Sequence, residues 1–145
     1  MGSGQDALRL AIDAGATSSK YSLYQRGKDP VEVGVFRGLN YTESGAEGVR
    51  AFSKSVREIA DKFPNLRYIG AAVAGIGRPD IRPRAVENFS AAFAEFRIAA
   101  DLYLFHDGEA ALWAGLGKGT GVIVSAGTGS IAFGRTPDGR EIRCG

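Results

Sequence analysis

The chain has 145 residues, 44% of them hydrophobic and 23% charged, with a formal net charge of +2. These values predict one globular domain with an ordinary core, and room for part of a second domain. Arg and Lys are scattered along the chain, so its charge gives no indication of nucleic-acid binding. The single cysteine, Cys144, excludes an internal disulfide and a cysteine-based metal site. With no apolar run long enough to cross a membrane and no secretory segment, we expect a cytoplasmic location.

The first part of the chain predicts three strands. They cover residues 8–14, 20–25 and 31–36, and turn residues separate them as in an antiparallel meander. Residues 1–4 have the composition of a cloning remnant, and we expect residues 1–6 to lie outside the fold.

Two amphipathic helices are predicted in the middle of the chain. Apolar residues at helical spacing from Val49 to Phe63 predict the first helix, which Pro64 ends. The second helix has Pro83 near its start. Its apolar side chains are expected on one face: Val86, Phe89, Phe93 and Phe96.

Short apolar runs at 68–74 and 102–105 predict buried strands between and after these helices. A third helix is expected to open at Asp107 and to break down in the glycine-rich stretch 115–121. The resulting order of strands and helices predicts an α/β fold, with a mixed five-stranded sheet and helices on its faces.

The end of the chain predicts a hairpin. Residues 131–135 and 141–143 flank a turn at 137–139, and the chain stops soon afterwards. We therefore expect residues 7–119 to form a first lobe and residues 120–145 to be the first strands of a truncated second lobe. Such orphaned strands would either associate with a neighbour, since an unpaired apolar edge invites pairing, or remain mobile.

Two turns of small, hydroxyl-bearing residues follow predicted strands. Asp13 runs into residues 14–18, Ala-Gly-Ala-Thr-Ser, and residues 125–130 read Ser-Ala-Gly-Thr-Gly-Ser. An unpaired carboxylate is costly to bury, so Asp13 should face a cation, a donor cluster or water. Because such turns leave backbone N–H groups uncovered, the pair predicts a clamp for a polyphosphate bound to Mg²⁺. The alternatives are a turn carboxylate that caps its own backbone and an ordinary glycine-rich hairpin turn.

Asp107 follows a predicted strand and begins a predicted helix. Two interpretations stay open: a helix N-cap, or a general base that accepts a proton from a hydroxyl attacking phosphorus. Because Asp13, Gly75 and Asp107 all come at strand ends, we expect these positions to converge.

Four stretches, in order, resemble the motifs of the actin-like ATPase superfamily of sugar kinases and actin. Within it, the chain resembles the BadF/BcrA-type group, which includes N-acetylglucosamine and glucosamine kinases. The stretches are 12–17, 74–79, 106–112 and 125–130, which resemble D-G-G-G-T, G-x-G-R-P, N-D-x-x-A-A-L and A-G-T-G-S respectively. The resemblance implies an RNase H-like fold and an ATP- and Mg²⁺-dependent kinase that phosphorylates a hydroxyl of an amino sugar. It also implies a homodimer whose ligands are a small sugar and ATP.

The resemblance also implies roles for single residues. Asp107 would be the catalytic base, and Asp13 would hold Mg²⁺ through water. The implied nucleotide-binding residues are Asp13, Gly15, Ala16, Thr17, Ser18, Gly127, Thr128 and Gly129. The implied sugar-binding residues are Asn40, Gly75, Asp107 and Ser130. The chain departs from the family pattern at four positions: Ala14 and Ala16 replace glycines, Ser18 replaces a frequent lysine, and His106 replaces an asparagine.

Other functions fit the sequence less well. A regulatory ATPase that activates a redox enzyme would need iron–sulfur cysteines, and this chain has only Cys144. A metal-dependent nuclease would need several carboxylates around two metal ions. A non-catalytic interaction module remains an alternative. In the family a second lobe completes the nucleotide pocket, so we expect little turnover from residues 1–145 alone.

Overall fold

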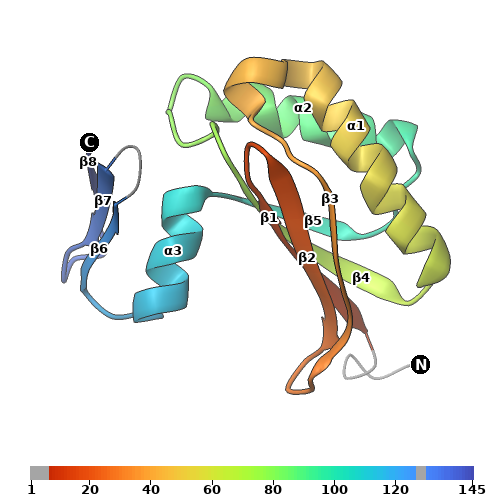
Figure 1. The fold of residues 1–145 in the computed structure, drawn as a ribbon, viewed down its shortest axis with the longest axis horizontal. Coiled ribbons are helices and arrows are strands. Elements are labelled where there is room, and N and C mark those ends of the chain that lie inside the picture. Colours follow the sequence, from red (N-terminus) through yellow and green to blue (C-terminus); the bar gives the residue numbers. More distant parts are fainter. Residues whose placement is uncertain (1–6, 127–129) are drawn as a thin grey trace. The chain divides into compact units, whose positions relative to one another are not determined.

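The computed structural model describes residues 7–126 and 130–145, and the chain divides into two compact units, one ending at His106 and one covering Asp107–Gly145 (Figure 1). The elements of the first unit, in chain order, are β1 (Leu8–Ala14), β2 (Ser18–Gln25), β3 (Pro30–Arg37), α1 (Tyr41–Lys62), β4 (Leu66–Val73), α2 (Arg82–Glu95) and β5 (Asp101–His106).

The first unit is built on a five-stranded sheet in the order β3-β2-β1-β4-β5. The pairs β1–β2 and β2–β3 are antiparallel, whereas β1–β4 and β4–β5 are parallel. The predicted α/β class and mixed five-stranded sheet are therefore confirmed. Because β1, β4 and β5 run in the same direction, their carboxyl ends meet at one edge of the sheet.

Alternation along β1 decides which face of the sheet is buried. Leu8, Leu10, Ile12 and Ala14 are at most 5% exposed, while Ala11 and Asp13, which alternate with them, are exposed. The buried side chains form one cluster with apolar residues of α1 and α2. The burial of this face is the main hydrophobic contribution to the fold.

Helix α1 begins earlier than the apolar spacing alone predicts, because Asn40 caps it. The Asn40 side chain accepts a hydrogen bond from the backbone N–H of Thr42. Gly45 has φ of 51° and ψ of −139° inside the helix and marks a kink, a conformation that glycine adopts easily. The residues buried at helical spacing after the kink are Val49, Phe52, Val56 and Ile59.

The predicted core face of α2 was wrong at one position. Val86 is 43% exposed, whereas the buried residues are Ala85, Phe89, Ala92 and Phe93. Successive residues are about 100° apart around a helix, so a face centred on Ala85 and Phe89 turns Val86 toward solvent. Phe89 stacks edge-on against Phe52 with ring centroids 5.5 Å apart, which fixes this choice of face.

The second unit contains α3 (Asp107–Leu116) and three antiparallel strands in the order β6-β7-β8. The strands are β6 (Gly121–Ala126), β7 (Ser130–Arg135) and β8 (Glu141–Cys144), so the predicted hairpin at 131–143 is confirmed. The lobe boundary near residue 119 stays a prediction. In the described residues, no helix combines the length and the apolar character needed to span a membrane.

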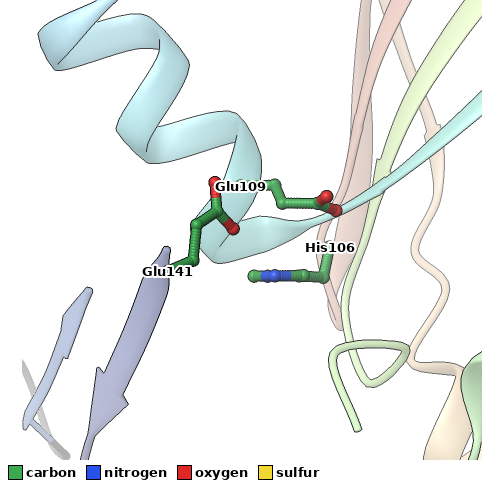
Figure 2. Close-up of side chains that lie close together, drawn as sticks. All are labelled: His106, Glu109 and Glu141. Carbon is green, nitrogen blue, oxygen red and sulfur yellow. The ribbon is translucent and has the colours of Figure 1, made fainter. Parts of the chain in front are cut away.

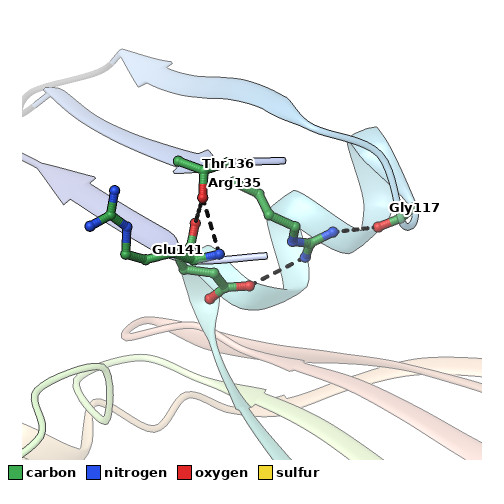
Figure 3. Close-up of polar contacts among 5 residues, drawn as sticks. Gly117, Arg135, Thr136 and Glu141 are labelled. Atoms are coloured by element: carbon green, nitrogen blue, oxygen red, sulfur yellow. Dashed lines mark hydrogen bonds and ion pairs between the residues drawn. The ribbon is translucent and has the colours of Figure 1, made fainter. Parts of the chain in front are cut away.

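Arg135 ties the second unit together (Figure 3). Its guanidinium donates to the carbonyl oxygen of Gly117 at 2.6 Å and pairs with Glu141 at 3.3 Å. The same group lies 5.0 Å from the ring centroid of Trp113. The Arg135 side chain is 9% exposed, so these contacts are partly screened from water and hold α3 to the sheet.

Candidate active site

Three backbone segments meet at the carboxyl ends of β1 and β4. The N–H of Leu39 donates to Gly15 O at 2.9 Å, and the N–H of Ala74 donates to Ala14 O at 3.1 Å. The N–H of Tyr41 donates to Ala74 O at 3.0 Å. The turn after β1, the entry to α1 and the loop after β4 therefore form one structure within the first unit.

Gly38 allows the α1 entry to lie against the turn after β1. A Cβ atom at this position would stand 2.4 Å from Ala16 O and 2.6 Å from Gly15 O. Both contacts are with backbone atoms, which cannot rotate away. The absence of a side chain at residue 38 is thus a condition for the shape of the 14–18 turn.

Gly75 likewise allows the loop after β4 to lie against the start of α1. Its φ of +86° is a conformation that favours glycine, and a Cβ would lie 2.6 Å from Asn40 Oδ1 and from Thr42 Oγ1. The Thr42 hydroxyl donates to Gly75 O at 3.2 Å. The two residues predicted to bind sugar in this unit, Asn40 and Gly75, are therefore close neighbours.

The Asn40 side chain has structural partners. Its Oδ1 accepts from the N–H of Thr42 at 3.2 Å, and its Nδ2 donates to Glu43 Oε1 at 2.9 Å. Its backbone O accepts from the Ser44 hydroxyl at 2.8 Å. These contacts orient the amide at the edge where the three segments meet.

Asp13 lies on the sheet face opposite the core. It is exposed and stands directly opposite Lys20 in the β1–β2 ladder. Directly opposite residues of an antiparallel pair share one face, so a carboxylate and an ammonium group flank the turn. The residues between them combine exposed Ala16 and Thr17 with partly buried Gly15 and Ser18.

Lys20 is the residue that reasoning from the sequence missed. Ser18 was identified as replacing a frequent lysine, and no cation was assigned to the turn. The signal was present in the hairpin register, because four residues, 15–18, lie between the paired residues Ala14 and Ser19, and this brings residue 20 opposite residue 13. The positive charge of Lys20 therefore lies two residues after Ser18, on the neighbouring strand β2.

Asp107 opens the second unit. It is exposed, begins α3 and accepts a hydrogen bond from the N–H of Gly108 at 3.0 Å. A Cβ at residue 108 would stand 2.2 Å from the ring of Phe133, so this glycine lets β7 pack against the start of α3. The preceding residue, His106, ends β5 in register with Val73 of β4.

Two acidic side chains of the second unit lie side by side (Figure 2). The carboxylates of Glu109 on α3 and Glu141 on β8 approach within 4.8 Å, and Glu141 is paired with Arg135. Four further residues were predicted to bind nucleotide or sugar. Gly127, Thr128 and Gly129 fall outside the described residues, and Ser130 is exposed and pairs with Ala126.

Comparisons with solved structures find the same fold. The chain superposes with TM-score 0.67 on a Chromobacterium violaceum protein assigned provisionally as an N-acetylglucosamine kinase, at 19% identity. A Porphyromonas gingivalis protein with the same provisional assignment gives TM-score 0.69 at 20% identity, and Schistosoma mansoni hexokinase complexed with glucose gives 0.56 at 14%. The chain is covered to 94%, 86% and 90% by these matches, but it spans only 48%, 43% and 36% of the three structures.

These likenesses confirm the actin-like ATPase fold seen in sugar kinases. No curated protein matches the chain. The sequence profile of the BadF/BadG/BcrA/BcrD ATPase family matches residues 10–145. The chain belongs to the BadF/BadG/BcrA/BcrD ATPase family.

Proposed function

We propose that this chain is the N-terminal lobe of an ATP-dependent kinase that phosphorylates a hydroxyl of an amino sugar, N-acetylglucosamine or glucosamine. The observation that carries the proposal is the meeting of three segments at one sheet edge. There the hydroxyl-bearing turn after β1, Asn40 and Gly75 are joined by direct hydrogen bonds through Leu39, Tyr41 and Thr42.

The turn after β1 suits a polyphosphate. Its small side chains let an anion approach the backbone, and Thr17 adds an exposed hydroxyl. Lys20 supplies positive charge on the face that Asp13 occupies. Gly127, Thr128 and Gly129 would contribute the second phosphate turn, as the sequence motif suggests.

Asp13 fits a magnesium ion held through water, because it is an exposed carboxylate at the end of a strand beside this turn. When bound, Mg²⁺ would neutralise charge on the phosphates. The chain's own contribution is to position the ligands, which β1 does well because strands flank it on both sides.

Asp107 is proposed as the general base. The sugar hydroxyl oxygen would attack the γ-phosphorus, its proton would pass to the Asp107 carboxylate, and the bond to the ADP oxygen would break. The Gly108 N–H donates to Asp107 Oδ1 and orients the carboxylate at the first turn of α3. Asn40, Gly75 and Ser130 would contact the sugar.

The test is sugar-dependent consumption of ATP by the full-length protein across a panel of hexosamines. Asp107→Asn should lower kcat by roughly 10²–10⁴-fold, the usual contribution of a general base. Asp101→Asn is the matched control, since Asp101 is an exposed aspartate at the start of β5, the strand whose last residue directly precedes Asp107. It should leave the rate unchanged.

Two results would contradict the kinase. Hydrolysis of ATP that ignores every sugar would favour a regulatory ATPase that activates a partner enzyme, and iron bound to the intact protein would support that alternative. Full activity of Asp107→Asn would show that Asp107 is not the general base.

We propose a cytoplasmic homodimer as the working form of the protein.

A further inference from the structure

Strand β3 forms one edge of the five-stranded sheet, and among residues 7–126 and 130–145 no strand pairs with its outer side. The strand has eight residues. Its three valines on the open face, Val31, Val33 and Val35, are 58%, 68% and 65% exposed. A long apolar edge with unpaired backbone groups is a template for another strand.

We propose that β3 pairs antiparallel with β3 of a second copy of this chain, about a two-fold axis through Val33. In an antiparallel pair, residues directly opposite share a face. With Val33 opposite Val33, each Val31 stands opposite a Val35, and the valines of both copies form one continuous row. Pairs of β-branched residues in such a row stabilise a sheet.

The charged residues at the two ends of β3 select this register. Asp29 immediately precedes the strand and Arg37 ends it, and both are exposed. When Val33 faces Val33, Asp29 of each copy stands opposite Arg37 of the other. A shift of two residues in the pairing would place Asp29 opposite Val35 or Leu39 and lose both charge pairs. The strand is therefore complementary to itself in one register.

On the other face of β3, Pro30 would stand opposite Phe36 of the second copy at each end of the pairing, and Pro30 has no N–H to donate. There Glu32 would stand opposite Gly34 of the second copy, and no two like charges would meet. The Glu32 carboxylate already accepts a hydrogen bond of 2.7 Å from the Tyr21 hydroxyl of its own sheet. Gly34 carries no side chain that could collide with it.

Strand β6 offers the competing edge, which the sequence alone favoured for self-association. It forms one edge of the three-stranded sheet, and Val122 and Val124 are each 66% exposed. Its six residues include no charged side chain, so nothing within β6 fixes a register. Its valines are thus a matched control for those of β3.

The first test compares Val33→Lys with Val122→Lys in the full-length protein by sedimentation velocity over a range of concentrations. We expect the wild-type protein to dimerise, and Val33→Lys to weaken dimerisation by at least roughly tenfold, because it sets two ammonium groups opposite each other. Val122→Lys should leave the dimer intact. Both valines are exposed, so far-UV circular dichroism should stay unchanged in both variants.

A charge exchange tests the register itself. Asp29→Arg should weaken the dimer, and adding Arg37→Asp to the same chain should restore it. Recovery in the double variant requires the two positions to face each other across the interface.

A cross-link gives the same information independently. In a Cys144→Ser background, Val33→Cys should form an intermolecular disulfide, since opposite Cα atoms lie about 4.5–5.5 Å apart. Val122→Cys in that background should not. A monomeric wild-type protein would overturn the proposal, whether or not another segment covers β3. Dissociation by Val122→Lys alone, a dimer that survives Val33→Lys, or a double charge variant that stays weak would overturn it as well.

Discussion

The two hairpins β1–β2 and β6–β7 have similar hydroxyl-rich sequences between their strands, but different numbers of buried contacts hold their strands in place. Strand β1 of the first hairpin is flanked by β2 and β4, and Ser19 at the start of β2 is fully buried, with its hydroxyl donating to Arg37 O at 3.0 Å. The second hairpin, β6–β7, belongs to a three-stranded sheet. In the described part of that sheet, Phe133 is the one buried hydrophobic residue.

This difference indicates how the strands of each hairpin are positioned. The first turn is bound to the α1 entry and to the loop after β4, so the first unit by itself holds it in place. The second hairpin relies on Phe133 packing near Gly108 and on Arg135. A rigid scaffold lowers the cost of binding a ligand, and we therefore expect the scaffold of the first hairpin to be the better preorganised of the two.

The largest effect is expected when a buried ring is removed from the core of each unit. Phe89→Ala should lower the free energy of unfolding by about 3–5 kcal/mol, because a fully buried ring leaves a cavity as well as losing its transfer energy. Phe133→Ala should cost about 1.5–3 kcal/mol, the transfer energy alone, since thin packing can collapse around the site.

Two spectroscopic signals separate the units in this experiment. Trp113, the single tryptophan, lies in α3 and contacts Arg135, so its fluorescence reports on the second unit. Far-UV circular dichroism is dominated by α1 and α2 of the first unit. If Phe133→Ala shifts both signals as far as Phe89→Ala does, the two units are equally supported and the comparison fails.

Much of the first unit could be predicted from the sequence. Leu8–Ala14 was predicted with its observed bounds, because alternation at β1 and an apolar run at β4 are local signals. The meeting of the first turn with Gly75 followed from both coming at strand ends. Val86 could not be assigned in this way, since two overlapping apolar faces of α2 differ only in what packs against them.

The tight approach at Gly38 was also beyond the sequence. It depends on where the entry to α1 crosses the turn after β1, a contact between segments that only the folded chain defines. Lys20 needed the register of a hairpin whose turn length was uncertain by one or two residues. For the second hairpin, the motif at 125–130 predicted a turn but carried no information on how firmly it is held.

An intermediate effect is expected at two glycines, Gly38 beside the first turn and Gly108 beside strand β7. Gly38→Ala should lower the free energy of unfolding by about 1–3 kcal/mol and weaken ATP binding, because the new Cβ meets backbone atoms at 2.4–2.6 Å. Gly108→Ala should cost less, since its Cβ meets the Phe133 ring, a side chain that can move. Chemical denaturation and nucleotide titration would measure both.

Gly70→Ala is the control for this pair. A Cβ at Gly70 would have its nearest neighbour, Phe105, at 3.9 Å, an ordinary contact, and the position lies inside β4. It should leave stability nearly unchanged. A Gly38→Ala variant as stable as Gly70→Ala would show that the turn yields easily, and the preorganisation of the first hairpin would then be in doubt.

The smallest effect concerns a hydrogen bond beside the first hairpin. The Tyr21 hydroxyl donates to Glu32, and this bond, together with burial and the charge of Glu32, raises the pKa of Tyr21 above its ordinary value of 10.0. The neutral phenol is favoured in the folded state, so its contribution is complete below pH 10 and is lost as the pH rises through the folded pKa. Tyr21→Phe should lower the free energy of unfolding by about 1 kcal/mol at neutral pH.

The pH dependence of stability tests that prediction specifically. The stability difference between wild type and Tyr21→Phe should shrink in alkaline solution, and ultraviolet titration should show one late-titrating tyrosine that the variant lacks. In the second unit, the Thr136 hydroxyl lowers the pKa of Asp138, but that carboxylate is fully exposed. Asp138→Asn should therefore have little effect on stability. A stability difference for Tyr21→Phe that stays constant through the alkaline range would show that ionisation of the phenol is not coupled to folding, and would contradict a hydrogen bond to Glu32 that raises its pKa.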